Sequence, residues 1–321
     1  MPKSIKYNTI IPYVSASRFQ SYQDTFSCND DAEYYGAYIW SQHAAASFYP
    51  LLQNLEVTLR NAIDAEAKRR FGQYWWDNIG FNGNRNLKGH QDNNCKFFDS
   101  IRGAERKLTS AWKRKERLRL GLPPTAPVPT PTPTWPHDKI IAATDFSAWE
   151  FILVDAFSTN DRNLRQQFLF PQSMGKIFKN YSSISNKPNQ ARRDLLDLIQ
   201  EVREYRNRLF HHEPLWIKSP TVTNDRTAID TVRKKINRAE KILFAINTKK
   251  HELLDKVGVF RHVRRVCSVD ELYIYTYSSP ELLLTSKKKR NLRKLTTQVN
   301  KAEKTLTFDY GEHTYALHKV R

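Results

Sequence analysis

Four polar residues near the middle of the chain could carry out chemistry on a phosphodiester: Arg206, Asn207, His211 and His212. A histidine can accept and donate a proton near neutral pH, and the planar guanidinium of an arginine fits a phosphate. Cleaving RNA without a metal ion requires deprotonation or orientation of the 2′-hydroxyl, protonation of the leaving 5′-oxygen and stabilisation of the charge on the phosphate. These residues could supply most of those functions, with Asn207 orienting a hydroxyl or the imidazole, and a second copy from a partner subunit would complete the set.

The helix that would position these residues is predicted over 190–212. Apolar residues recur in it every three or four positions and form one face: Leu195, Leu198, Val202, Tyr205 and Leu209. Asn207 and His211 lie on the opposite face, about 160° from the apolar one. Pro214 disfavours a longer helix, so both histidines are expected in the last turn, where the helix dipole favours a cation. The alternative is an ordinary solvated helix face, because the six-residue string alone is weak evidence.

The charge of the chain points to a polyanionic partner. The chain has 52 Lys and Arg against 33 Asp and Glu, a net charge of +19. Most of the excess lies in 101–120, in 287–304 and in a third cluster over 233–241. Because neutralisation of phosphates dominates affinity for nucleic acid, we expect RNA contacts from these clusters, although solvated charged helices are the alternative. The candidate RNA-binding residues are Lys113, Arg114, Lys115, Arg117, Lys287, Lys288, Lys289 and Arg290.

Composition excludes several other classes of protein. Apolar residues make up 40% of the chain and aromatic residues 12%, enough for a folded core. No stretch approaches about 18 consecutive apolar residues, so no membrane span is expected, and the first residues lack the apolar region of a secretory signal. Cys28, Cys95 and Cys267 are too far apart for a Cys-x-x-Cys site and too few for a disulfide framework. We therefore expect a cytoplasmic protein without a metal site, and we identify no cofactor.

The chain divides around a stretch rich in proline and threonine. Residues 121–136 hold seven prolines and no charged residue, which favours an extended linker or loop. The predicted parts on either side are an N-terminal helical part over 1–120, including the basic helix, and a second helical part over 137–260. A basic C-terminal extension follows over 261–321.

The predicted elements are mostly helices. Residues 31–72 read as a helix that Pro50 would break or kink, 145–157 as a buried helix with Asp145 or Ser147 as its N-cap, and 229–257 as further helix. Near the end, 271–277 is rich in β-forming residues and could be a strand. Residues 305–308 and 314–317 flank a plausible hairpin turn. The predicted fold is therefore mainly α, a helical bundle with a small C-terminal β element.

Two strings in this sequence resemble motifs of one family. Residues 206–216 (RNRLFHHEPLW) resemble the R-N-R-x-x-H-H-E-P motif of bacterial abortive-infection (Abi-like) proteins, and Arg206 to His211 matches the R-x(4–6)-H signature of HEPN domains. Residues 54–64 (NLEVTLRNAID) resemble the L-E-V-x-L-R-N-A motif of the same family, and 72–76 (GQYWW) are also similar to it. The resemblance covers about 31–76 and 145–216.

The resemblance implies an all-α HEPN core that acts as a metal-independent endoribonuclease, usually as a homodimer whose signature helices face each other. Arg206 and His211 would be the catalytic pair, Asn207 would occupy the polar position after the arginine, and His212 also satisfies the loose spacing. The products would carry a 2′,3′-cyclic phosphate. The implied biology is phage defence or toxin–antitoxin growth arrest, with an antitoxin or a small inhibitory non-coding RNA as a further partner.

Two other functions stay open. One is a non-catalytic RNA-binding HEPN module that regulates or scaffolds a defence system, in which Arg206 and His211 only stabilise a dimer. The other is a general nucleic-acid binder that acts through charge alone.

The first motif contains three candidate supporting residues, Glu56, Arg60 and Asn61. Glu56 and Arg60 are four residues apart, the spacing of a helical ion pair. Arg60-Asn61 repeats the Arg-Asn pair of the second motif, but no histidine follows it at the signature spacing. We therefore expect these residues to support the fold or the site, and direct contact with RNA is the alternative.

Overall fold

The structure is a computed structural model that describes residues 5–216, 219–276, 290–294 and 296–297, together with the backbone of 306–310 and 313–317. It contains two units, Met1–Tyr277 and Ser278–Arg321. The described chain is mainly α-helical, which confirms the predicted fold class at that level. Among its described helices, none combines the length and the apolar character needed to cross a membrane.

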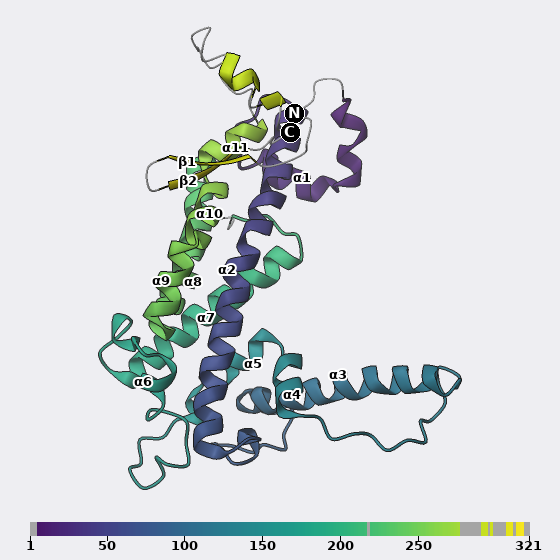
Figure 1. Ribbon diagram of the computed structural model, residues 1–321, viewed down its shortest axis with the longest axis vertical. Helices are drawn as coiled ribbons and strands as arrows, with labels where there is room; N and C mark the ends of the chain where they lie inside the picture. The colour runs from purple at the N-terminus through teal and green to yellow at the C-terminus, as the bar shows by residue number, and fades with distance from the viewer. Residues whose placement is uncertain are drawn as a thin grey trace. The chain divides into compact units, whose positions relative to one another are not determined.

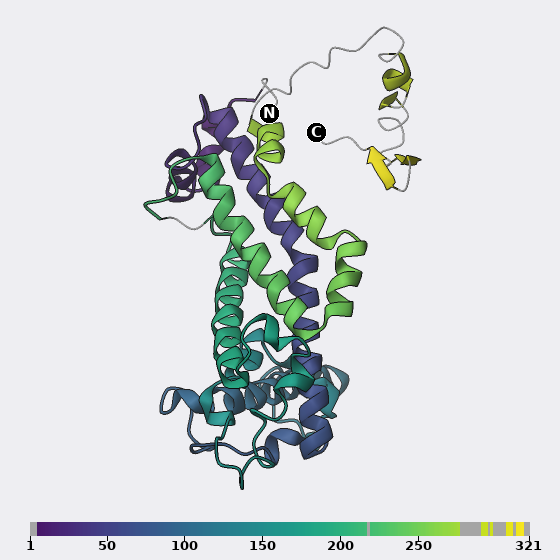
Figure 2. The ribbon, with the colours of Figure 1, turned by 90° about the vertical axis from the view of Figure 1, so that its left-hand side faces the viewer.

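The first unit is built from helices that pack around the long helix α2 (Figures 1 and 2). Helices α8, α10 and α11 pack against α2, and α7 packs against α8. The α-helices are α1 (Ala16–Gln23), α2 (Asp31–Phe71), α3 (Lys96–Arg119), α4 (His137–Ala143), α5 (Phe146–Phe151), α6 (Met174–Ile177), α7 (Pro188–Phe210), α8 (Asp225–Ile246), α9 (Thr248–Lys256), α10 (Val259–Val266) and α11 (Val269–Thr276). Short 3₁₀ helices connect several of them: η1 (Tyr7–Thr9), η2 (Ile11–Tyr13), η3 (Trp75–Asp77), η4 (Asn93–Cys95), η5 (Asp155–Phe157) and η6 (Tyr181–Ser183).

Helix α2 has well-defined ends and runs without interruption between them. The side chain of Asp30 caps its first turn by accepting a hydrogen bond from the Glu33 amide at 2.9 Å, and Gly72 ends it with a φ of 89°. The predicted break at Pro50 does not occur. Pro50 is exposed, so water can bond the carbonyl that lacks its usual partner, while burial of the opposite face of α2 holds the helix together.

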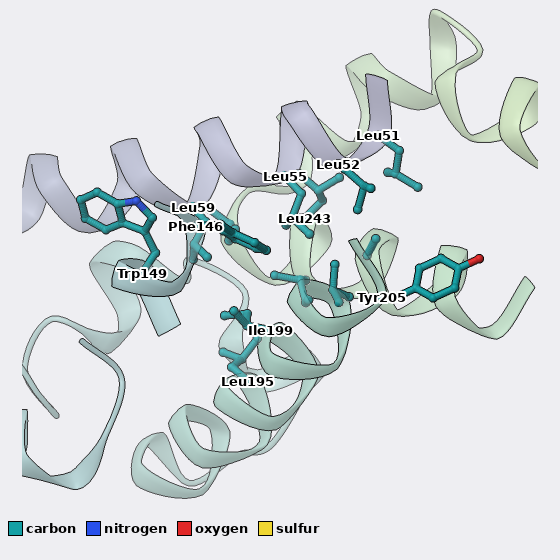
Figure 3. Close-up of a cluster of buried hydrophobic side chains, with 14 of the residues drawn as sticks. Leu51, Leu52, Leu55, Leu59, Phe146, Trp149, Leu195, Ile199, Tyr205 and Leu243 are labelled. Carbon is teal, nitrogen blue, oxygen red and sulfur yellow. The ribbon is translucent and has the colours of Figure 1, made fainter. Parts of the chain in front are cut away.

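The core lies between α2, α5, α7 and α8 (Figure 3). Figure 3 shows leucines of α2 facing side chains of α5 and α7. On α7 the buried residues include Leu195, Ile199, Val202 and Tyr205. Leu198, predicted to belong to this face, is only half-buried, because the buried face follows Ile199, which comes four residues after Leu195.

Two predicted elements differ from the structure. Instead of one buried helix over 145–157, α5 ends at Phe151. Asp145 is its N-cap residue, one of the two predicted, but its side chain makes no capping hydrogen bond and pairs with Lys107 at 2.8 Å. The strand predicted over 271–277 is wrong, because α11 is helical through Thr276. Leu272 and Tyr275 of α11 are buried at helical spacing in the core, so packing against α2 outweighs the β propensity of the aromatic residues.

The proline-rich segment returns along α3 and forms an arm together with that helix (Figure 1). The backbone carbonyl of Ala126 accepts a hydrogen bond from Arg117 at 2.7 Å, Thr130 donates to Glu116 at 2.8 Å, and the Trp135 indole donates to Thr109 at 3.0 Å. Residues 121–136 are therefore a loop fastened to α3. The parts of the chain before and after it belong to the same unit.

The second unit contains two strands, β1 (Leu306–Tyr310) and β2 (His313–Leu317). They pair antiparallel, with Leu306 opposite Leu317 and Tyr310 opposite His313. The boundary between the units follows residue 277, whereas the predicted C-terminal extension begins at residue 261.

Candidate functional site

The C-terminal end of α7 carries the candidate catalytic residues and has the hydrogen bonds of a Schellman motif. The helix ends at Phe210, His211 is its C-cap, and His212 adopts the left-handed conformation with a φ of 57°. The His212 amide donates to the Leu209 carbonyl at 3.1 Å, and the Glu213 amide donates to the Arg208 carbonyl at 3.0 Å. The two histidines therefore follow the last helical turn, rather than lying in it as predicted.

The chain after this cap is fixed by burial. Pro214 prevents further helix, and Trp216 is only 2% exposed. The Trp216 ring makes edge contacts with the rings of Tyr22 and Phe26, with centroid distances of 5.0 and 4.7 Å. The His-His-Glu-Pro turn is thus held between a packed helix and a packed tryptophan.

Arg206 lies half-exposed beside this turn. Its guanidinium carbon is 4.7 Å from the centroid of the Phe210 ring, within range of a cation–π interaction. Its Nη1 lies 3.5 Å from Asn207 Oδ1, at the limit of a hydrogen bond, and its Nη2 lies 3.9 Å from Glu56 Oε2. These weak contacts orient the side chain of Arg206 without occupying its hydrogen-bond donors fully.

His211 is exposed to solvent. Within the described part of the chain, no side chain forms a hydrogen bond with its imidazole. Its backbone carbonyl accepts a hydrogen bond from Arg18 of α1 at 3.3 Å. Arg18 was not predicted as part of the site, because 193 residues separate it from His211 and no local sequence signal links the two.

The first motif supplies residues to two different sides of α2. Glu56 approaches Arg206, which links the two motifs in space, while Arg60 donates to Asn61 at 3.5 Å. The expected ion pair between Glu56 and Arg60 is replaced by the contact of Glu56 with Arg206. Asn61 lies about 140° around the helix from Glu56 and lines a groove away from Arg206.

The basic residues predicted to bind RNA are in part exposed on α3. Lys113, Arg114 and Lys115 are exposed there. Arg117 is half-buried and its Nε donates to the proline-rich loop, so it fastens the arm. Arg290, in the second unit, is exposed, and residues 287–289 lie outside the described residues.

Of these exposed residues, Arg114 borders an open hollow of about 730 Å³ on α3, whereas Lys113 and Lys115 do not line it. Arg106 and Lys107 also line this hollow, and Arg106, Ser110 and Arg114 follow one another at the spacing of successive helical turns. Lys107 is paired with Asp145, so Arg106 and Arg114 are the lining cations for which the described residues provide no ion pair.

Comparison with known proteins identifies no relative of this chain. The chain matches no protein-family model, and it is significantly similar to none of the curated proteins or solved structures with which it was compared. The described residues also contain no group of three or more His, Cys, Asp or Glu side chains arranged to hold a metal ion. The resemblance to Abi-like HEPN proteins thus stays a prediction from the two motifs.

Proposed function

We propose that this chain is a metal-independent endoribonuclease of the HEPN type, similar to Abi-like proteins, and that Arg206 and His211 are its catalytic pair. The observation that carries the proposal is the structure of one helix end. A half-exposed guanidinium and an exposed imidazole flank the same rigid C-cap. An exposed pair on a fixed backbone is available to a substrate, as the proposed reaction requires.

In the proposed reaction, the 2′-oxygen of a ribose attacks the adjacent phosphorus and the bond from phosphorus to the 5′-oxygen breaks. His211 transfers a proton, as the base that takes it from the 2′-hydroxyl or as the acid that gives it to the leaving 5′-oxygen. Arg206 stabilises the negative charge on the phosphate oxygens, and Asn207 orients Arg206 or the hydroxyl. The products are a 2′,3′-cyclic phosphate and a 5′-hydroxyl.

A homodimer completes the site in this proposal. In each copy His211 is the proposed proton-transfer group, whereas the reaction needs both a base and an acid. A second α7 end facing the first supplies the other imidazole.

The proposed partners are inferred from the positive charge of the chain and from its resemblance to Abi-like proteins. RNA is the substrate, and the exposed cations of α3 are its proposed docking surface. The family resemblance adds toxin–antitoxin or phage-defence biology in the cytoplasm, with an antitoxin or a small inhibitory RNA holding the activity in check.

The test compares RNA cleavage in EDTA by the parent protein and by the variants Arg206→Ala and His211→Ala. As a control for folding, both variants must melt at the same temperature as the parent. We expect both variants to lose cleavage by about 100-fold or more, and the parent products to end in a 2′,3′-cyclic phosphate. Arg193→Ala on the exposed side of α7 and His90→Ala in a surface loop are matched controls that should retain activity.

Variants that cleave as well as the parent would remove the site assignment. RNA binding by the parent without any cleavage would favour the non-catalytic RNA-binding module instead. For the toxin role, expression of the parent should arrest growth while His211→Ala does not, and equal colony counts would contradict that role.

A further inference from the structure

A second concave surface lies on the side of α2 that faces away from Arg206. It is a groove of about 810 Å³ between α2, α6 and the junction of α8 with α9. This volume is within the range of small-molecule and cofactor sites. Nothing in the proposed nuclease chemistry uses the groove, so its chemistry can be considered separately. We call it the lysine groove.

Three lysines surround the lysine groove: Lys176, Lys179 and Lys250. None of them forms an ion pair with a described residue. They come from two separate segments, one around α6 and one at the start of α9. Because three unpaired ammonium groups repel each other, their convergence on one hollow favours an anion between them.

The carboxylate in the lysine groove does not cancel this charge. Glu66 is the acid among the described lining residues. Its two oxygens accept hydrogen bonds from Arg69 at 2.7 and 2.9 Å and from Ser173 at 3.0 Å. Burial raises the pKa of Glu66, but these hydrogen bonds together with the positive charges of Arg69 and Arg70 outweigh burial, and the pKa is lowered. Its charge is therefore balanced by Arg69, and the lysines remain uncompensated.

Part of the lining of the lysine groove is apolar and made of small or branched side chains: Val57, Ala62, Ala65, Ile177 and Ile246. Backbone hydrogen bonds join the segment after α6 to the end of α8, since Lys179 N donates to the Ile246 carbonyl at 3.2 Å and Asn180 N donates to the Ala245 carbonyl at 2.9 Å. The groove therefore suits a ligand that has an apolar part as well as negative charge.

Two amides add directional hydrogen bonding. Asn61 and Asn247 both line the lysine groove. Asn247 Oδ1 accepts from the Lys250 amide at 3.1 Å and so caps α9, which leaves the amide nitrogen of Asn247 as a donor. Asparagine amides pair well with the edges of nucleobases.

From these features we infer that the lysine groove binds a nucleoside phosphate, either as a free nucleotide or as one nucleotide of an RNA strand. The phosphates contact Lys176, Lys179 and Lys250, and the base lies against the apolar lining within reach of both Asn61 and Asn247. This inference does not rest on the nuclease activity, because the lysine groove and Arg206 lie on different sides of α2.

The experiment measures binding of ATP by calorimetry and of a 3′-labelled, 5′-phosphorylated ten-nucleotide uridine RNA by fluorescence anisotropy. The full chain carries His211→Ala in all samples, so that RNA stays intact. The test variant adds Lys176→Ala, Lys179→Ala and Lys250→Ala. A charge-matched control variant instead adds Lys88→Ala, Lys139→Ala and Lys187→Ala, which replaces three exposed lysines outside the lysine groove.

We expect the groove variant to bind at least one ligand about tenfold more weakly or worse, while the control variant stays within about twofold of its parent. A loss confined to ATP identifies a free nucleotide as the ligand, and a loss confined to the RNA identifies a strand. The single variant Asn61→Ala should also weaken binding without changing the melting temperature.

Equal losses in the two triple variants would overturn the inference, because they would reflect net charge alone. Absence of binding of both ligands to the parent would overturn it as well. A failure of the nuclease proposal is distinguishable, since it would appear as missing RNA cleavage with binding in the lysine groove intact.

Discussion

The conformation of His212 makes a prediction that separates the two histidines of the motif. His212 occupies the left-handed position of the Schellman motif with a φ of 57°, a conformation that glycine adopts without steric cost. We expect His212→Gly to leave the end of α7 intact. Since the exposed imidazole of His211 keeps its place in this variant, RNA cleavage should persist, whereas His211→Ala should abolish it.

The magnitude follows from the backbone. A non-glycine residue in the left-handed region destabilises the folded state by about 1 kcal/mol or more. Glycine avoids this strain but lowers stability by about 0.5–1 kcal/mol, because it increases the entropy of the unfolded chain. The two terms nearly balance, so His212→Gly should change the free energy of unfolding by less than about 1 kcal/mol, in the stabilising direction if at all. The β-branched variant His212→Val should instead lose about 1–2 kcal/mol.

The assay is urea denaturation followed by circular dichroism, with cleavage of a labelled RNA measured on the same samples. His212→Gly that is as unstable as His212→Val would show that this turn is not left-handed. His212→Gly that is stable but inactive, beside an active His211→Ala, would move the catalytic role from His211 to His212.

Two further predictions concern stability. Trp216→Ala should destabilise the protein by about 3–5 kcal/mol, because it removes the buried ring that packs on Tyr22 and Phe26, and a urea midpoint equal to that of the parent would contradict this. The lowered pKa of Glu66 means that its ionised form stabilises the folded state above its ordinary pKa of 4.5, and that this contribution is lost as the pH falls through the folded-state value. In urea unfolding at pH 7, 5, 4 and 3, the free energy of unfolding should therefore fall more steeply with decreasing pH for the parent than for Glu66→Gln. An equal pH dependence in the two proteins would refute the role of Glu66.

Local sequence signals predicted the long helices well. The expected helix over 31–72 corresponds to Asp31–Phe71, which Asp30 caps and Gly72 ends in the structure. The helix expected over 190–212 corresponds to Pro188–Phe210. The difference at its end arises because the histidines form the cap, a detail that hydrophobic periodicity does not contain.

Structural features that depend on residues distant in the sequence could not be predicted. The aromatic residues over 271–277 favour strand locally, but their helix is set by packing on α2. Composition predicts an extended linker or loop over the proline-rich segment, and its attachment to α3 depends on Arg117 and Glu116. Likewise the contact of Glu56 with Arg206 joins motifs 150 residues apart, which spacing alone could not reveal.

Helix α2 explains how the first motif can serve several surfaces at once. Successive residues of a helix point in directions about 100° apart, so one short segment reaches three environments. Leu55 and Leu59 enter the core, Glu56 approaches the guanidinium of Arg206, and Asn61 lines the lysine groove. Because the leucines lock the helix in place, neither polar face can shift without disturbing the core. The candidate nuclease site and the lysine groove are therefore held at a fixed separation on one element, and substitutions on either polar face can be tested independently.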